Sequence, residues 1–170
     1  MTVVYTIGYE GTDIDRFVST LKAVGVKKVA DVRAVALSRK KGFSKKALSA
    51  RLKAEGIEYS HFIELGDPKA GREAARLRLY LEFRDIYEKY LDSDKAQLSF
   101  HHLSAAVREA PTCLLCFERE PATCHRSIIA EQLAESGIEV FDLYGDNPER
   151  YVLDASKLTR HHPGQSATAA

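Results

Sequence analysis

The chain has 170 residues, of which 45% are hydrophobic, and its 25 basic and 24 acidic residues leave a formal net charge of +1. This length suits one domain with a sizeable core, and the near-neutral charge excludes the overall basic field of a nucleic-acid coat protein. No apolar run approaches the roughly 20 residues of a membrane-spanning helix, and the first residues form a strand-like pattern rather than a basic signal peptide, so we expect a cytoplasmic protein.

Hydrophobic spacing predicts strands and helices that alternate along the chain. In chain order we expect a strand at 3–7, a helix at 13–24, a strand at 28–33, a helix at 44–54, a strand at 57–63, helices at 77–91 and 95–108, a strand at 112–117, a helix at 127–136 and a strand at 138–143. Asp13 and Ser44 are suitable N-caps, and Gly25 lies where a glycine commonly ends a helix.

Strands that alternate with helices of ten or more residues imply right-handed crossovers and a largely parallel sheet covered on both faces. The predicted fold is therefore α/β: a three-layer sandwich with a mainly parallel, roughly five-stranded sheet, Rossmann-like. Residues 1–153 form the single predicted domain. Residues 154–170 lose periodicity and end in small and polar residues, which predicts a mobile tail.

The stretch that joins the predicted strand 112–117 to the following helix is chemically unusual. The first turn of a helix normally favours acidic side chains, because the macrodipole places partial positive charge there. This helix instead begins with His125 and Arg126 beside Cys124. Such violations of local preference tend to fall at functional sites, and a helix N-terminus flanked by cations can bind an anion.

In parallel sheets ligands bind outside the carboxyl ends of the strands. Residues suited to binding or catalysis follow the ends of four predicted strands. They are Tyr9 and Glu10 after the first, Arg33 and Ser38 after the second, Gly66 after the third, and Glu118, Cys124, His125 and Arg126 after the fourth. The sequence therefore predicts that four loops converge on one rim.

Several of these motifs together resemble the family catalogued as domain of unknown function 488. The resemblance covers about residues 3 to 145 and rests on residues 6–11, residues 31–33 with Ser38 and 42–44, residues 56–59 with 65–66, residues 115–118, and residues 124–126. It implies a small α/β domain whose signature residues gather at one site, and it supplies no substrate. Ala36 departs from the family, which often has proline in that loop.

The candidate catalytic residues are Cys124, His125 and Glu10, and each has a structural alternative. A thiol beside a helix N-terminus and two cations favours the nucleophilic thiolate, but a small thiol can equally lie inert under a loop. His125 suits a general acid or base, or a capping contact. Glu10 suits a general base, and Tyr9 a stacking or hydroxyl contact, unless this loop is merely held in place by its tyrosine.

The candidate substrate-binding residues are Tyr9, Arg33, Ser38, Glu118 and Arg126. The forked guanidinium groups of Arg33 and Arg126 suit phosphate or carboxylate. The structural alternative is that they pair with Asp31 and Glu118. Both interpretations can hold together, since a carboxylate can orient an arginine toward a ligand.

The three cysteines lie between residues 113 and 124, without the spread of paired half-cystines, so we expect reduced thiols. Cys113 and Cys116 are three positions apart in a strand and should point to opposite faces, unlike a redox C-x-x-C pair. Cys116, Cys124 and His125 offer three zinc ligands, but no second paired set accompanies them, and two adjacent residues are awkward ligands for one tetrahedral ion. We therefore predict neither a metal nor a cofactor.

Three hypotheses follow for function. The first is an enzyme that acts on an anionic, phosphate-bearing substrate at the rim. The second is a nucleotide or nucleic-acid binding module without thiol chemistry, which uses the same arginines and the basic segment 39–46 around Phe43. The third is a redox or sulfur-transfer protein, which requires Cys116 and Cys124 to come within disulfide reach. The sequence leaves the oligomeric state open.

Overall fold

The computed structural model describes residues 1–153 and 158–160. Its elements are β1 (Val3–Gly8), α1 (Ile14–Ala23), β2 (Lys28–Asp31), α2 (Lys45–Ala54), β3 (Glu58–His61), η1 (Ile63–Leu65), α3 (Lys69–Arg76), α4 (Tyr80–Leu91), α5 (Asp94–Glu109), β4 (Thr112–Cys116), η2 (Pro121–Thr123), α6 (His125–Glu135), β5 (Glu139–Tyr144), α7 (Glu149–Leu153) and β6 (Thr159–Arg160). The predicted alternation of strands and helices is confirmed.

The described strands form one six-stranded sheet in the order β3-β2-β4-β1-β5-β6. The first five run parallel, and β6 pairs with β5 in the antiparallel direction. In the sheet centre Ile7 lies opposite Leu115 on one side and Leu143 on the other. The mainly parallel α/β class is therefore confirmed, with one short strand more than the sequence indicates.

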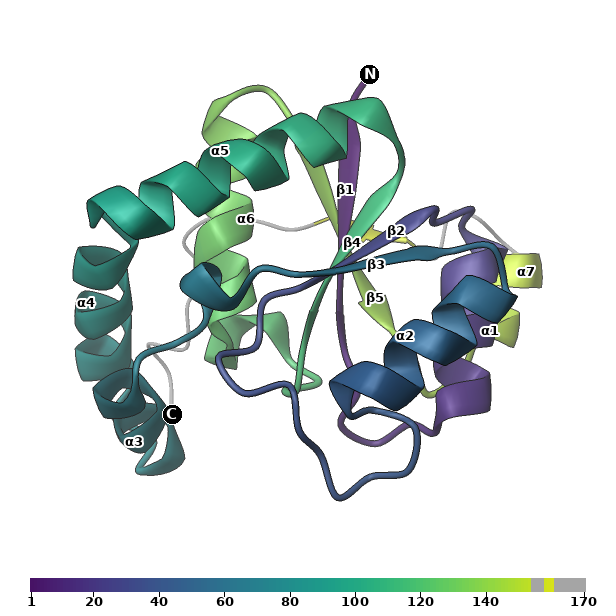
Figure 1. The fold of residues 1–170 in the computed structure, drawn as a ribbon, viewed down its shortest axis with the longest axis horizontal. Coiled ribbons are helices and arrows are strands. Elements are labelled where there is room, and N and C mark those ends of the chain that lie inside the picture. Colours follow the sequence, from purple (N-terminus) through teal and green to yellow (C-terminus); the bar gives the residue numbers. More distant parts are fainter. Residues whose placement is uncertain (154–157, 161–170) are drawn as a thin grey trace.

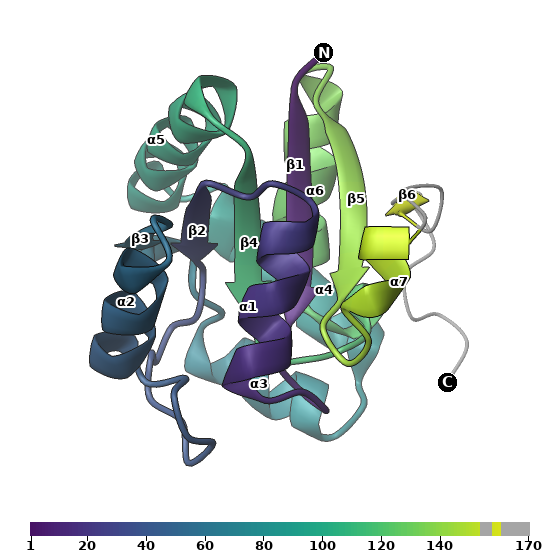
Figure 2. The same cartoon turned by 90° about the vertical axis from the view of Figure 1, so that its right-hand side faces the viewer.

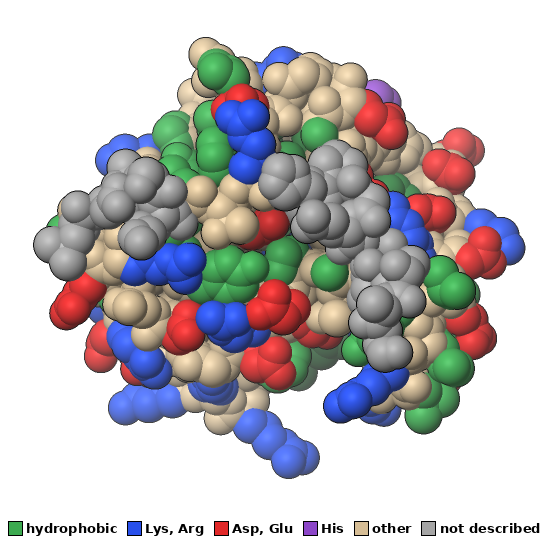
Figure 3. Space-filling view, turned by 180° about the vertical axis from the view of Figure 1, so that it is seen from behind, with side chains coloured by type: hydrophobic (Ala, Val, Ile, Leu, Met, Phe, Trp, Pro, Cys, Tyr) green, Lys and Arg blue, Asp and Glu red, His purple; other side chains and the backbone are tan. Residues whose placement is uncertain are grey.

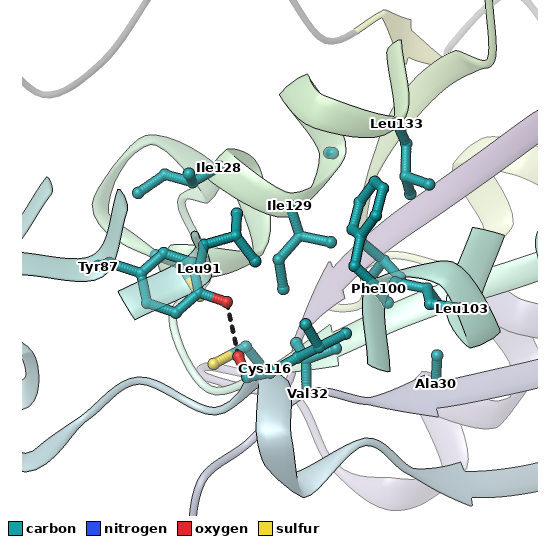
Figure 4. Close-up of a cluster of buried hydrophobic side chains, with 14 of the residues drawn as sticks. Ala30, Val32, Tyr87, Leu91, Phe100, Leu103, Cys116, Ile128, Ile129 and Leu133 are labelled. Carbon is teal, nitrogen blue, oxygen red and sulfur yellow. Dashed lines mark hydrogen bonds between the residues drawn. The ribbon is translucent and has the colours of Figure 1, made fainter. Parts of the chain in front are cut away.

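Helices cover both faces of the sheet and make three layers (Figures 1 and 2). One buried cluster joins the sheet to α3, α4, α5 and α6, and a second joins its other face to α1 and α2. Cys116 belongs to the first cluster and Cys113 to the second, which confirms that these two cysteines point to opposite faces. Figure 4 shows Cys116 among the aliphatic and aromatic side chains of the first cluster.

Local sequence explains where helix α1 begins and ends. The Asp13 carboxylate accepts a hydrogen bond from the backbone N–H of Arg16 at 2.8 Å and so caps α1, as predicted. Phe17 and Leu21 are fully buried on its inner face. Gly25 follows with a φ of 77°, a left-handed conformation that glycine adopts without strain.

Two local predictions need correction. The predicted helix 77–91 is present as α4 but begins at Tyr80, and a turn with Arg78 at a φ of 58° separates it from α3, a helix that the sequence analysis did not predict. Leu77 and Leu81 supply helical periodicity, but both side chains are 71% exposed, so that periodicity does not mark a buried face. Ser44 precedes α2 without capping it through its side chain, because its hydroxyl instead bonds the backbone of Ser38.

Beyond the predicted domain, Thr159–Arg160 forms β6, whereas the rest of the predicted tail, 154–157 and 161–170, lies outside the described residues. Within the described part of the chain no helix combines the length and apolar character needed to cross a bilayer. Basic and acidic side chains are interspersed on the face in Figure 3, in keeping with the net charge of +1.

Candidate functional site

A cavity of about 540 Å³ lies at the carboxyl edge of the sheet. Segments that follow β1, β2, β3 and β4 line it, because parallel strands bring their carboxyl ends to one edge. The lining residues with polar or ionisable side chains are Tyr9, Glu10, Arg33, Asp67, Arg72, Arg76, Tyr80, Cys116, Glu118, Thr123, Cys124 and His125. The structure thus brings together most of the predicted site residues.

Two cysteines and one histidine form the buried floor of this cavity. Cys124 is the N-cap of α6 and His125 is its first residue. The Nδ1 atom of His125 lies 3.9 Å from the sulfur of Cys124 and 3.7 Å from that of Cys116. The Nε2 atom lies 2.7 Å from the carbonyl oxygen of Val32. Since a carbonyl only accepts, Nε2 carries a proton and Nδ1 is directed at the two sulfurs.

The surroundings of Cys124 favour its ionised form. Burial opposes ionisation, but the hydrogen bond from the Cys116 thiol and the charges of Arg126 and His125 lower the pKa of Cys124 well below its ordinary value. Burial also disfavours the charged form of His125, yet the interaction with Cys124 raises the pKa of His125 to about 9. Both shifts therefore favour a thiolate–imidazolium pair over a neutral thiol beside a neutral imidazole.

Two groups beside this pair retain their protons. The pKa of Cys116 lies well above its ordinary value, because its thiol donates to Cys124 and because it is buried. Burial, together with the charge of Cys124, raises the pKa of Glu118 to about 8. The sulfur of Cys116 lies 3.6 Å from the Glu118 carboxyl. The thiolate is therefore surrounded by groups that can supply a proton.

Arg126, predicted to bind substrate, lies beneath the loop after β4 and does not line the cavity. Its side chain is fully buried, and its guanidinium donates to the backbone carbonyls of Glu118 at 2.6 Å and Arg119 at 3.1 Å. The expected alternative, pairing with the Glu118 carboxylate, is not among its hydrogen bonds within the described part of the chain. Arg126 fixes the loop shape and contributes its charge to Cys124.

Arg33 lines the cavity, but its donors are engaged within the protein. Its Nε and Nη2 atoms donate to the two carboxylate oxygens of Asp31 at 2.9 and 2.7 Å, and Nη1 donates to the carbonyl of Phe43 at 2.7 Å. The Tyr59 hydroxyl also donates to Asp31. The predicted structural pairing of Arg33 with Asp31 is therefore present. The two residues are two positions apart along an extended segment, so their side chains lie on the same face.

Tyr9, Glu10 and Ser38 occupy different positions. The Tyr9 ring is stacked on Phe43 with 4.5 Å between centroids and borders the cavity. Glu10 is exposed at the cavity edge, where its carboxylate accepts a 3.0 Å bond from the backbone N–H of Arg119. Ser38 bonds within its own loop and does not line the cavity.

Sequence reasoning missed the cavity wall that follows β3. Asp67 is 5% exposed, and its Oδ1 atom has no hydrogen-bond partner among the described residues. Burial raises the pKa of Asp67 to about 6. The Nε atom of Arg72, in α3, is likewise buried without a partner in the described part of the chain. The close packing here requires a glycine at position 71, because a Cβ there would lie 2.0 Å from Asp67 Oδ1, but hydrophobic spacing in the sequence does not indicate this contact.

The cysteine and histidine side chains can also hold a metal ion. Sγ of Cys116, Sγ of Cys124 and Nδ1 of His125 all lie within 4.8 Å of one another, and they form the one such donor group among the described residues. Soft sulfur and imidazole donors suit zinc. The sequence argument that neighbouring residues are awkward ligands does not apply here, because Cys124 as the N-cap and His125 in the helix direct their side chains to one point.

Comparison with known proteins adds one finding. The family model described as "Domain of unknown function DUF488" matches residues 13–133, a span that holds β2, β4, the whole α3 wall and the cysteine–histidine cluster. No curated protein and no solved structure matches the chain significantly.

Proposed function

The chain belongs to the DUF488 family, and from its cavity we propose an enzyme that acts on an anionic, phosphate-bearing substrate through the thiol of Cys124. The observation that carries this proposal is the placement of the Cys124–His125 pair on the floor of a cavity whose wall holds Arg72, with its Nε atom unpartnered among the described residues. A thiolate is the nucleophilic form of cysteine, and an adjacent imidazolium maintains it.

Arg72 is the best-placed side chain for the anionic group. Its Nε atom lacks a partner in the described part of the chain, whereas the donors of Arg33 are engaged by Asp31 and Phe43. Arg76, one turn later in α3, lines the same wall. The N-terminus of α6 adds partial positive charge at the floor. In this proposal the anion is therefore bound by the arginines of α3 and by the N-terminus of α6. Arg33 contributes positive charge, while its donors stay engaged within the protein.

The thiolate would attack an electrophilic centre of the substrate and form a covalent intermediate. A leaving group expelled in that step needs a proton, and His125 and the protonated carboxyl of Glu118 lie beside the sulfur. After proton donation, either group can act as a base that activates water for release of the product. The positions of these groups supply acid and base chemistry at neutral pH without an external catalyst.

The test is site-resolved alkylation of Cys124 with iodoacetamide in the presence of anionic competitors. We expect inorganic phosphate and adenosine monophosphate to slow alkylation, and Arg72→Gln to weaken that protection at least about 10-fold, the loss of one charge-assisted contact. Lys46→Gln removes a charge from an exposed residue of α2 that does not line the cavity, and it serves as the control. Unaltered alkylation at high anion concentration would contradict the proposal.

A nucleotide-binding module without thiol chemistry is the second candidate, and the cavity mouth favours it over a nucleic-acid groove. Phe117, which is 43% exposed, and Tyr80 both border the cavity and can stack on a base. By contrast, Phe43 in the basic segment is fully buried, and Lys40 donates to the backbone carbonyls of Tyr9 and Thr12. Binding of adenosine monophosphate by a Cys124→Ser variant with unchanged affinity, together with no covalent adduct in the wild type, would favour this alternative.

A further inference from the structure

The proposed reaction leaves Cys116 without a chemical role, although its thiol lies at the same place as Cys124. The two residues come from different elements, the last position of β4 and the N-cap of α6, with the η2 turn between them. Their sulfurs lie within 4.8 Å of each other, and both residues line the cavity. Both cysteines are free thiols.

We propose that Cys124 and Cys116 also reduce hydroperoxides, with Cys124 as the attacking cysteine and Cys116 as the resolving cysteine that closes an intramolecular disulfide. This activity uses the same ionised thiol as the proposed function, but it requires no anionic substrate. The substrate class is a small hydroperoxide, and an external dithiol would restore the reduced pair. To form the disulfide, the two sulfurs must approach from a separation of at most 4.8 Å to roughly 2.05 Å.

The two steps balance with one hydroperoxide molecule. In the first, the Cys124 thiolate attacks one peroxide oxygen, the O–O bond breaks, and the departing alkoxide or hydroxide takes a proton from His125, leaving Cys124 as a sulfenic acid. In the second, the Cys116 sulfur attacks the Cys124 sulfur, the S–O bond breaks, and the hydroxide leaves as water with the Cys116 proton. The two sulfurs lose two electrons, and the peroxide gains them.

The surroundings of the sulfurs match both steps. Arg126 is buried beside them, and its positive charge acts on Cys124 and on Cys116. That charge stabilises the attacking thiolate and the negative charge that develops on the departing oxygen. Cys113 cannot replace Cys116, because it is fully buried in the cluster on the opposite face of the sheet.

The experiment treats the reduced protein with hydrogen peroxide in the presence of a chelator, blocks the remaining thiols and maps the products by mass spectrometry. The chelator is needed because the same side chains can hold a metal. Trypsin cleaves after Arg119, between the two cysteines, so a disulfide joins two separate peptides. We expect a peptide pair linked through Cys116 and Cys124, both in the wild type and in Cys113→Ser.

The variant Cys116→Ser separates the two steps. Without the resolving thiol, we expect Cys124 to accumulate as a sulfenic acid that dimedone traps, and Cys116→Ala gives a second variant should the serine perturb folding. The thiolate is the reactive form of cysteine, and the positive charges of Arg126 and His125 beside Cys124 favour it, at the cost of some intrinsic nucleophilicity. We expect the wild type to consume peroxide at least about 10-fold faster than free cysteine.

Three results would overturn this proposal: peroxide consumption no faster than that of free cysteine, oxidation without a Cys116–Cys124 link, or a link through Cys113. Its failure is distinguishable from failure of the proposed function. If Cys124 alkylates rapidly and anions protect it while no disulfide forms, only the peroxide reaction is wrong. If the disulfide forms while anions give no protection, only the anionic substrate is wrong.

Discussion

The Nδ1 atom of His125 lies 3.9 Å from the sulfur of Cys124, while the other ring nitrogen donates to the carbonyl of Val32 at 2.7 Å. The bond to Val32 explains the contact with Cys124. Because Nε2 donates its proton to the carbonyl, only Nδ1 of the ring can face the thiol. Val32 follows β2 immediately, so the sheet itself sets the orientation of the imidazole. A proton that moves from Cys124 to Nδ1 leaves a buried ion pair at the cavity floor.

We predict that His125→Asn raises the pKa of Cys124, because the variant loses both the cation and the hydrogen bond to the sulfur. In the wild type the alkylation rate of Cys124 should level off at a lower pH than the rate of an ordinary thiol does, because its pKa is lowered. In the variant the rate should level off at a higher pH than in the wild type. The measurement is iodoacetamide labelling of each cysteine, resolved by mass spectrometry.

A matched control is His61→Asn, because the ring of His61 also bonds a backbone carbonyl, that of Arg33 at 2.7 Å, but does not line the cavity. This variant should keep the wild-type pH dependence of Cys124 alkylation. A wild-type rate for Cys124 with the pH dependence of an ordinary thiol, whose pKa is about 8.5, would refute the ion pair whatever the variants do.

We predict that Arg126→Met destabilises the fold by about 2–4 kcal/mol, since it leaves two buried carbonyl oxygens, those of Glu118 and Arg119, without their charged donor. Urea unfolding gives the value. The control Arg16→Met removes a half-exposed ion pair with Asp13 and should cost about 1 kcal/mol or less. An Arg126→Met protein with wild-type stability and lost anion protection would instead assign Arg126 to the ligand, as the sequence suggested.

The sequence predicted two kinds of feature in the site. One is the alternation of side chains along a strand, and the other is the succession of strand, loop and helix within a short stretch of the chain. Alternation along a strand places Asp31 and Arg33 on one face, and they form an ion pair at 2.7 Å. The same rule separates Cys113 from Cys116. The rim position of Cys124 follows from the parallel sheet, because a strand, a loop and a helix N-terminus must occur in that order.

The α3 wall could not be predicted in this way, because long-range fit positions it. Gly66 touches the backbone after β2 so closely that a Cβ would lie 2.3 Å from the Ala34 Cα. The Tyr87 hydroxyl of α4 donates to the carbonyl of Leu65 at 2.6 Å, the bond drawn in Figure 4. These contacts join residues distant in the sequence and orient Asp67 into the cavity. The spacing of hydrophobic residues within a short stretch of sequence does not indicate such contacts.

A third prediction concerns Gly8, at the end of β1. A Cβ at this position would lie 1.7 Å from the carbonyl oxygen of Glu118, which has no room to retreat because Arg126 holds it. Gly8→Ala should therefore destabilise the protein by about 3 kcal/mol. We also expect it to slow alkylation of Cys124, since the displaced loop carries Glu118 and the charge environment of the thiol.

The matched control for Gly8→Ala is Gly11→Ala, in the loop after the same strand. Gly11 has a φ of 79°, and no described atom lies within 4 Å of the place that a Cβ would take, so alanine there suffers backbone strain of about 1 kcal/mol without a clash. If urea unfolding shows that the two variants lose equal stability, then the clash with the Glu118 loop is not what restricts position 8 to glycine.

The last prediction is that Asp67→Asn stabilises the protein at neutral pH. Burial raises the pKa of Asp67 from 3.8 to about 6, so the folded state binds this proton more tightly than the unfolded chain. Stability must then fall as pH rises from about 4 to about 6, and the full penalty, up to about 3 kcal/mol, persists above that range. Urea unfolding should show the variant more stable than the wild type at pH 7.5 and equal to it at pH 4.

Asp92→Asn, an exposed change at the C-cap of α4, should show no such pH-dependent difference. A variant less stable than the wild type at pH 7.5 would mean that the Asp67 carboxylate is needed, ionised, beside His125.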